Sequence, residues 1–452
     1  MEKKFYIKTY GCQMNELDGQ QMGRLLKGSG YVPTMDPEDA EVILINTCSI
    51  REKASHKVYS DVGRFRALKL KKPEVVLGVT GCQAQAEGPY LQKRFPYLDL
   101  VIGPDHTAKI PEMVGKALLQ KSSQAALQFE KPENYRFLNL LPEEEENQTK
   151  AFVTIMKGCD NFCSFCIVPM VRGREVCRDP EEILLEVQAL AEHGVLEVTL
   201  LGQNVNSYGV GRHAEDSPKK RSQTPIMSFA SLLSCISRES KIERIRFTTS
   251  HPKDLSEELV QEFECNPKLA KHFHLPVQSG SDPVLERMYR GYTRAEYMKK
   301  VVALRKACPD MALSTDIIVG FPGETEEDFA RTMDLLSEVG YDFIYSFSYS
   351  PRPKTTAALY FEDDIADGLK QERLQRVQEL QERLTWEKHR SLVGRVLDVL
   401  VDGPSKIGGT LSGRSSQFHV VHFEGGVEDL GKILPVKITQ AGPNSLIGEK
   451  NG

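Results

Sequence analysis

The sequence predicts three consecutive domains: an N-terminal parallel α/β domain, a central partial (βα)6 barrel and a small C-terminal antiparallel β-barrel. Short apolar runs alternate with helical patterns over the first 120 residues, and six further strand-then-helix units begin near residue 151. After Gly394 the pattern changes to short β-rich runs separated by Gly- and Pro-containing turns. The 452 residues are enough for about three domains, which we place at 1–120, 151–384 and 385–452, with a linker at 121–150.

The composition excludes several classes of protein. Lys plus Arg number 58 and Asp plus Glu number 63, so the net charge of -5 indicates no general affinity for nucleic acid, and any RNA-binding surface must be a local patch. Met1–Tyr10 lacks the apolar core of a signal peptide, and no stretch approaches the roughly 18 apolar residues of a membrane span. We therefore expect a cytoplasmic protein without membrane contact, whose ten cysteines serve as ligands and buried thiols and not as disulfides.

Three cysteines follow predicted strands of the N-terminal domain. The strands, with a helical pattern between the first two at Leu17–Lys27, are Phe5–Ile7, Val42–Ile45 and Val75–Val79; the cysteines are Cys12, Cys48 and Cys82. Because the carboxyl ends of parallel strands share one edge of a sheet, the three thiols are expected to meet there as ligands of an iron-sulfur cluster. The alternative for any one of them is a small buried core residue.

Residues 121–150 interrupt the α/β pattern with Ser122, Ser123 and the acidic run Glu143–Glu146. We interpret this stretch as a linker whose acidic run forms a solvated face.

The central domain contains the most specific motif, in which Cys159, Cys163 and Cys166 are separated by three and then two residues. The motif follows the first of six predicted strands, at the end of a barrel where active sites lie. The six strands are Phe152–Met156, Val195–Leu201, Ile242–Thr248, His272–Leu275, Met311–Val319 and Asp342–Phe347. Zinc sites more often use two separate pairs of ligands, so the spacing favours an iron-sulfur cluster with one iron open to a small molecule.

Four polar loops follow other strands of the barrel. They are Gly202–Asn206, Thr249–Pro252, Val277–Gly280 and Gly320–Glu324. Each loop could be ordinary turn chemistry, but four on one rim indicate a binding site. We interpret His251 and His274 as structural histidines, and Cys177, Cys235, Cys265 and Cys308 as structural cysteines without a shared spacing.

The C-terminal segment begins with an amphipathic helix over Leu369–Val393 that should close the central domain. The β-rich runs after it, Arg395–Val401, His419–Phe423 and Ile433–Thr439, predict the small antiparallel barrel. Such barrels often bind RNA, and the candidates for contacts to phosphate or bases are Lys406, Arg414, His419 and Lys437. A structural appendage is the alternative.

The spacing of Cys159, Cys163 and Cys166 resembles the signature of the radical S-adenosylmethionine superfamily. The resemblance implies a 4Fe-4S cluster whose open iron chelates S-adenosylmethionine, with Phe165 near the adenine. The Gly-Gly-Glu run usual in that superfamily is absent, and Gly202-Gln203-Asn204 stands at the corresponding strand end. The cofactor contacts implied are therefore Phe165, Gln203, Ser250 and Gln278.

With Cys12, Cys48 and Cys82 added, the chain from residue 5 to about 448 resembles the methylthiotransferase family, which ends in a TRAM domain. Four motifs look like its MiaB type: Tyr10–Asn15, Gly202–Tyr208, His274–Gly280 and Ser350–Pro353. That type uses two 4Fe-4S clusters and two S-adenosylmethionine molecules to methylthiolate C2 of N6-isopentenyladenosine in the tRNA anticodon loop. The implied partners are tRNA and an electron donor such as flavodoxin or ferredoxin, and the implied state is a monomer.

The chemistry agrees with this resemblance, because no side-chain base can deprotonate an unactivated adenine C–H and the cofactors must perform that step. We predict no catalytic side chain, and the adenine must leave its stack to react. The alternatives are methylthiolation of threonylcarbamoyladenosine or of a ribosomal-protein aspartate, and a non-catalytic RNA-binding iron-sulfur protein. The aspartate branch usually reads Gly-Cys-Pro-Lys where this chain has Gly11-Cys12-Gln13-Met14.

Overall fold

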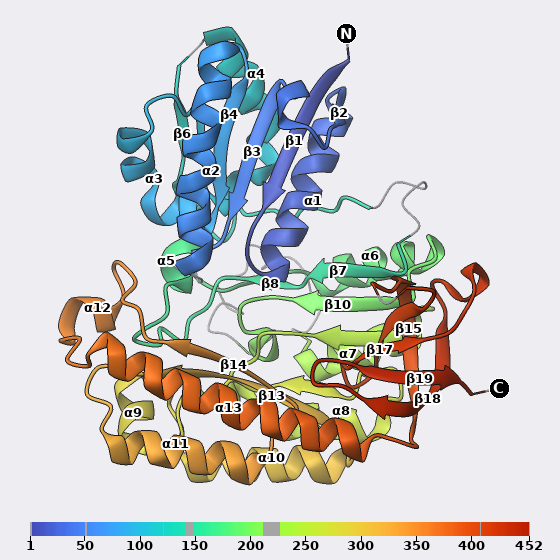
Figure 1. Ribbon diagram of the computed structural model, residues 1–452. Helices are drawn as coiled ribbons and strands as arrows, with labels where there is room; N and C mark the ends of the chain where they lie inside the picture. The colour runs from blue at the N-terminus through green and yellow to red at the C-terminus, as the bar shows by residue number, and fades with distance from the viewer. Residues whose placement is uncertain are drawn as a thin grey trace.

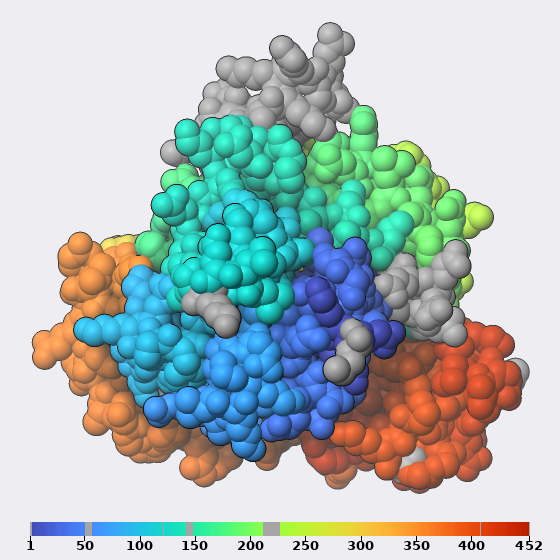
Figure 2. Space-filling view, turned by 90° about the horizontal axis from the view of Figure 1, so that it is seen from above, coloured from blue at the N-terminus to red at the C-terminus, as the bar shows by residue number. Residues whose placement is uncertain are grey.

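The computed structural model describes residues 2–49, 52–120, 122–141, 148–210, 227–406 and 408–451. It confirms the predicted order of a parallel α/β domain, a partial barrel and a small closed barrel (Figure 1). Seen from above, the N-terminal domain covers the middle of the molecule, and the small barrel lies to one side (Figure 2). The acidic run Glu143–Glu146 lies outside the described residues.

The N-terminal domain is a six-stranded parallel sheet in the order β2-β1-β3-β4-β5-β6. Its strands are β1 (Lys3–Thr9), β2 (Tyr31–Pro33), β3 (Val42–Thr47), β4 (Val76–Gly81), β5 (Leu100–Ile102) and β6 (Gln124–Ala126). Apolar side chains of α2 (Glu52–Lys71) and α3 (Cys82–Arg94) cover one face of the sheet. Those of α1 (Gln13–Gly28) and α4 (Ile110–Gln120) cover the other. Burial on both faces explains why β3 and β4 are apolar without alternation.

The short strands β2, β5 and β6 were not predicted. Each has three residues, too few to show a period, and β6 lies inside the stretch expected to be a linker. Backbone pairing of Gln124 with Leu100 and of Ala126 with Ile102 attaches this stretch to the N-terminal sheet.

The central domain contains all six predicted strands. They are β7 (Lys150–Thr154), β10 (Glu197–Leu201), β11 (Arg244–Phe247), β12 (His272–His274), β13 (Ala312–Val319) and β14 (Phe343–Ser348). They form the parallel sheets β11-β10-β7 and β12-β13-β14, and a bridge between Ile245 and Leu269 connects the chain before β12 to β11. One apolar core joins these strands to the surrounding helices α6 (Pro180–Glu192), α7 (Phe229–Glu239), α8 (Glu257–Cys265), α10 (Arg294–Ala307) and α11 (Glu326–Val339).

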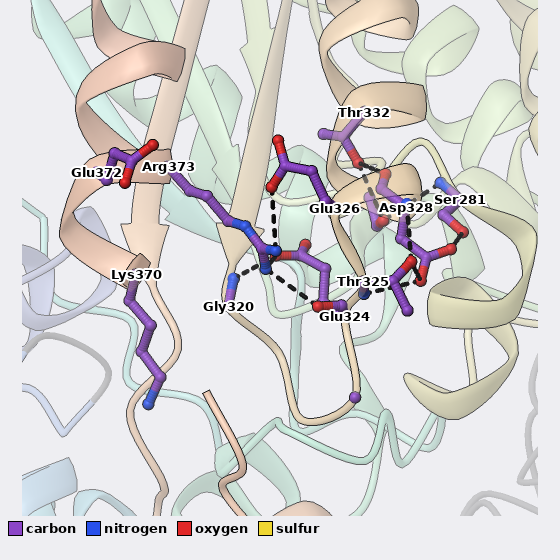
Figure 3. A network of polar contacts seen from close by, with 12 residues as sticks. Ser281, Gly320, Glu324, Thr325, Glu326, Asp328, Thr332, Lys370, Glu372 and Arg373 are labelled. Atoms are coloured by element: carbon purple, nitrogen blue, oxygen red, sulfur yellow. Dashed lines mark hydrogen bonds and ion pairs between the residues drawn. The ribbon is translucent and has the colours of Figure 1, made fainter. Parts of the chain in front are cut away.

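The helix α13 (Asp367–Ser391) closes the central domain, as predicted. Arg373 on this helix reaches Glu324 in the loop after β13, and their charged groups lie 2.8 Å apart (Figure 3). The same carboxylate accepts a hydrogen bond of 2.7 Å from the backbone of Gly320. The loop Gly320–Glu324, expected on the binding rim, therefore holds α13 in place through its glutamate.

The C-terminal domain is a closed five-stranded barrel in the order β15-β16-β17-β19-β18. Its strands are β15 (Val396–Pro404), β16 (Leu411–Ser415), β17 (Val420–Phe423), β18 (Ile433–Ala441) and β19 (Leu446–Lys450). The sequence did not reveal β16 and β19. Four of the pairings are antiparallel as expected, whereas β17 and β19 pair in parallel. Along the chain that the structure describes, no helix is long and apolar enough to cross a membrane.

Candidate functional site

The first group of candidate ligands lies in the loop between β8 (Met156–Lys157) and α5 (Val168–Arg172), beyond the carboxyl end of β7. Gly158 opens the loop with φ of +76°, and a Cβ there would lie 2.0 Å from the carbonyl oxygen of Arg174. Only glycine fits this close approach. Cys159 N then donates a hydrogen bond of 3.3 Å to Gly173 O, which turns the chain back over the barrel.

Cys163 lies close enough to Cys159 and Cys166 to raise the pKa of both of these thiols. Burial raises the pKa of Cys159, and the neighbouring thiols raise it further. Burial also raises the pKa of Cys166 to about 12, with Cys163 adding to the rise. Three such thiols would lose their protons together only beside a compensating positive charge, and the iron of a cluster supplies one.

A buried arginine supports the same assignment. Arg290 donates hydrogen bonds to Cys163 Sγ (3.3 Å), to Pro276 O (2.6 Å) and to Tyr292 Oη (3.0 Å), and it is only 4% exposed. None of the carboxylates in the described part of the chain forms an ion pair with it. A buried guanidinium needs a negative partner, and a cluster held by three thiolates fits that requirement.

His251 also contacts this group. Its Nε2 lies 3.7 Å from Cys163 Sγ, and its Nδ1 accepts a hydrogen bond of 3.1 Å from Lys253 N. Burial, assisted by Arg290, lowers the pKa of His251, so the ring is neutral with its proton on Nε2. The residue interpreted as merely structural thus presents an N–H to a candidate ligand.

The second group lies at the carboxyl edge of the N-terminal sheet. Cys12 precedes α1, Cys48 follows β3, and Cys82 begins α3. A hydrogen bond from the Cys48 side chain lowers the pKa of Cys12 to about 6, and Arg172 assists. Gly11 packs on Cys48, because a Cβ at this glycine would lie 2.2 Å from the Cβ of Cys48. Cys82 also lies close enough to Cys12 for that thiol to raise its pKa, so the structure brings the three strand-end thiols together, as the sequence predicts.

Arg172 reaches from the central domain to the second group. It ends α5, six residues after Cys166, yet its guanidinium lies in the N-terminal domain. Its Nε donates to Cys82 Sγ (3.1 Å), and its Nη2 donates to Asn15 Oδ1 (2.9 Å) and Asp18 Oδ2 (2.6 Å). All of these residues are buried. The central domain therefore contributes a buried residue to the second site.

No three Cys, His, Asp or Glu side chains among the described residues converge closely enough to hold a single metal ion. A 4Fe-4S cluster makes a different demand, because each thiolate binds a separate iron and the sulfurs lie further apart. The two groups of thiols suit a cluster better than a lone ion.

The predicted cofactor contacts occupy the rim of the barrel. Phe165 packs edge-on against Phe321, with ring centroids 6.5 Å apart. The Gln203 side chain accepts a hydrogen bond from Gly158 N, and Ser250 Oγ donates to His274 O. Gln278 is buried, with φ of +75°. In these contacts Gln203 and Ser250 fix the loops, and contact of the four side chains with S-adenosylmethionine stays a prediction.

The loops also bind one another. Asp254 Oδ2 accepts hydrogen bonds from Asn204 Nδ2 (2.7 Å) and, in the cysteine loop, from Asn161 Nδ2 (3.3 Å). The polar residues after β10 and β11 thus hold the cysteine loop at the rim.

One predicted RNA contact is wrong. His419 is only 2% exposed, and its ring lies 5.3 Å from that of Phe343 and 5.1 Å from that of His389. Its position in a β-rich run gave no sign that the central domain covers it. Lys406 and Lys437 are exposed, as an RNA contact would require.

Three family models match consecutive parts of the chain: the uncharacterized protein family UPF0004 at residues 4–103, the Radical SAM superfamily at 153–336 and the TRAM domain at 390–450. A tRNA-2-methylthio-N(6)-dimethylallyladenosine synthase of Geobacter metallireducens is 51% identical over 449 residues, covering 99% of this chain and 98% of that protein. The chain belongs to the tRNA-2-methylthio-N(6)-dimethylallyladenosine synthase family. A member from Syntrophotalea carbinolica is 46% identical over 450 residues, covering 99% of this chain and all of that protein.

Solved structures support the fold of this family member. The radical S-adenosylmethionine methyltransferase TsrM from Kitasatospora setae, with tryptophan and an S-adenosylmethionine analogue bound, has a TM-score of 0.56. It is 15% identical, and the match covers 79% of this chain and 75% of that one. A second TsrM structure, with cobalamin and a 4Fe-4S cluster bound, has a TM-score of 0.54 at 14% identity, covering 79% and 77% of the two chains.

Proposed function

We propose that this protein methylthiolates C2 of N6-isopentenyladenosine in the anticodon loop of tRNA. The observation that carries the proposal is the pair of three-thiol groups, one at the rim of the partial barrel and one at the edge of the N-terminal sheet. Arg172 spans the boundary between them, within 3.1 Å of Cys82 Sγ. The names of the full-length relatives support tRNA as the substrate.

The residues suited to hold the cofactors follow from the site. Cys159, Cys163 and Cys166 would hold one 4Fe-4S cluster, and Cys12, Cys48 and Cys82 the second. Phe165, on the apolar wall with Phe321, would lie against the adenine of S-adenosylmethionine. When bound, these cofactors supply the hydrogen abstraction and the sulfur transfer that side chains cannot perform.

The protein itself orients and shields the reacting groups. Gln203 fixes Gly158 at the start of the cysteine loop, and Arg290 supplies hydrogen bonds and positive charge beside Cys163. The barrel formed by β15–β19 presents Lys406 and Lys437 to the phosphates of tRNA. An extruded adenine costs a few kcal/mol to unstack, and less in a flexible loop.

The test is mass spectrometry of tRNA nucleosides from a strain lacking the gene, complemented with the wild-type chain. We expect the 2-methylthio group on isopentenyladenosine to disappear in the deletion strain and to return on complementation. Complementation with Cys163→Ala should fail, whereas Cys265→Ala, an exposed cysteine outside both groups, should succeed. Loss of the group from threonylcarbamoyladenosine instead, or unchanged tRNA, would contradict the proposed substrate.

A further inference from the structure

Each group of candidate ligands has one buried arginine beside a thiol, but only one of these arginines has a carboxylate partner. Arg172 lies 3.1 Å from Cys82 Sγ, and its Nη2 forms an ion pair of 2.6 Å with Asp18. Arg290 lies 3.3 Å from Cys163 Sγ, and no carboxylate in the described ranges pairs with it. The two sites therefore have similar hydrogen bonds from an arginine, but only at the N-terminal site does an ion pair with a carboxylate neutralise that arginine.

The other buried charged residues around Arg172 and Asp18 are also paired with a residue of opposite charge. The two residues line a cavity of about 40 Å³ between the domains, together with Lys157 and Asp105. Lys157 Nζ and Asp105 Oδ2 form a second buried ion pair of 2.6 Å. The buried charges that line this cavity cancel in pairs, and Arg136, which also lines it, is exposed to solvent.

Charge beside an iron-sulfur cluster sets how readily it accepts an electron. A positive charge and hydrogen bonds to the sulfurs favour the reduced cluster, whereas a nearby carboxylate opposes reduction. Buried charges are screened little by solvent or salt, so the difference between the two sites persists in the folded protein. His251, 3.7 Å from Cys163 Sγ, adds a further N–H to the site in the central domain.

We propose that Asp18 directs electrons to the cluster of the central domain. By neutralising Arg172, it keeps the N-terminal cluster harder to reduce than the cluster beside Arg290. One electron leaves an external one-electron donor and is gained by the central-domain cluster, and no bond forms or breaks. The electron therefore arrives where S-adenosylmethionine binds. This role rests on the proposed function, because it requires both clusters.

The test measures the reduction potential of each cluster in the full chain. The triple variant Cys159→Ala/Cys163→Ala/Cys166→Ala retains the N-terminal site, and Cys12→Ala/Cys48→Ala/Cys82→Ala retains the central one. Each is reconstituted with iron and sulfide, and its potential is measured by a redox titration followed by electron paramagnetic resonance. In the wild-type pair of sites, the N-terminal cluster should have the more negative potential.

Two substitutions should move the N-terminal potential in opposite directions. Asp18→Asn leaves Arg172 uncompensated and should make the potential more positive, changing the ratio of reduced to oxidised cluster roughly tenfold, about 59 mV for one electron. Arg172→Gln leaves the Asp18 carboxylate uncompensated and should make it more negative. Arg172→Lys keeps the positive charge, so its N-terminal potential should be closer to that of the wild type. Glu16→Gln removes an exposed carboxylate from α1, the helix that carries Asp18, and should leave the N-terminal potential unchanged.

The outcomes separate the two claims. Absence of iron from either triple variant would contradict the ligand assignment on which the proposed function rests. If both sites bind clusters but Asp18→Asn and Arg172→Gln shift the potential in the same direction, or not at all, the role of Asp18 is overturned. A purely structural ion pair would lower stability in both variants without opposite shifts.

Discussion

Arg246 in β11 donates a hydrogen bond of 2.6 Å from Nη2 to the carbonyl oxygen of Ser415 at the end of β16. Arg244, two residues earlier, donates to the carbonyl oxygens of Arg414 (3.2 Å) and Asp398 (3.1 Å). Glu197 Oε2 lies 2.9 Å from Arg246 and 3.4 Å from Arg244. This buried triad fixes the C-terminal barrel on the central domain.

Replacing Arg246 should therefore destabilise the junction with the barrel. Arg246→Met breaks a buried ion pair and leaves backbone carbonyls without their donor, so we expect a loss of roughly 3 kcal/mol in the free energy of unfolding. Urea unfolding followed by the fluorescence of the single tryptophan, Trp386 in α13, measures it. Arg395→Gln removes an exposed pair with Asp310 and should cost less than about 1 kcal/mol. Equal losses would contradict the role of the triad.

Glu175 should make stability depend on pH. Its pKa is raised from 4.5 to about 7, chiefly by burial and also by Asp160 and Asp254, whereas a hydrogen bond from Ser207 opposes the rise. A raised carboxyl pKa stabilises the fold fully below about pH 4.5, and this contribution disappears as the pH rises through 7. The wild type should therefore lose up to roughly 3 kcal/mol relative to Glu175→Gln between pH 4.5 and 8. Denaturant unfolding of both proteins across this range checks it, and parallel curves would contradict it.

The sequence predicted the strands and ligands whose signals are local. Long buried strands such as β3 show as apolar runs, and the spacing of Cys159, Cys163 and Cys166 is visible within eight residues. Three-residue edge strands such as β6 take their conformation from the neighbour that pairs with them, so no local pattern reveals them.

The residues that complete the site depend on contacts distant in sequence. Arg172 meets Cys82 across 90 positions, and Arg290 meets Cys163 across 127. Arg172 stands in a helical pattern that predicts a solvated face, and only the packing of two domains makes it a partner of a thiol. At Glu324 the sequence predicted a ligand site that the contacts explain differently. Its loop is rich in Gly and Pro, which suggested ligand binding, but the carboxylate forms an ion pair with Arg373 (Figure 3).

Gly280, in a loop predicted at the binding rim, should be required for packing. A Cβ there would lie 2.6 Å from both the carbonyl oxygen of Arg331 and the Cα of Thr332, in the backbone of α11. Gly280→Ala should cost roughly 1–3 kcal/mol in the free energy of unfolding, because the helix backbone must move away. Gly368→Ala, in α13 with nothing within 4 Å, should instead stabilise by about 0.5 kcal/mol. If Gly280→Ala left the free energy of unfolding unchanged, the loop would have room for a side chain.

Cys48 should be required for one cluster and not for the other. It lies at the end of β3, its side chain hydrogen-bonds Cys12, and both residues belong to the N-terminal domain. Cys48→Ala should therefore lose about half of the bound iron and all sulfur insertion. Because Cys159, Cys163 and Cys166 remain intact, the variant should still form 5'-deoxyadenosine from S-adenosylmethionine under dithionite. Cys308→Ala, which removes a buried core thiol, should retain both the iron and the product. Iron content measured against protein concentration decides the matter, since unchanged iron in Cys48→Ala would mean that the second cluster is held elsewhere.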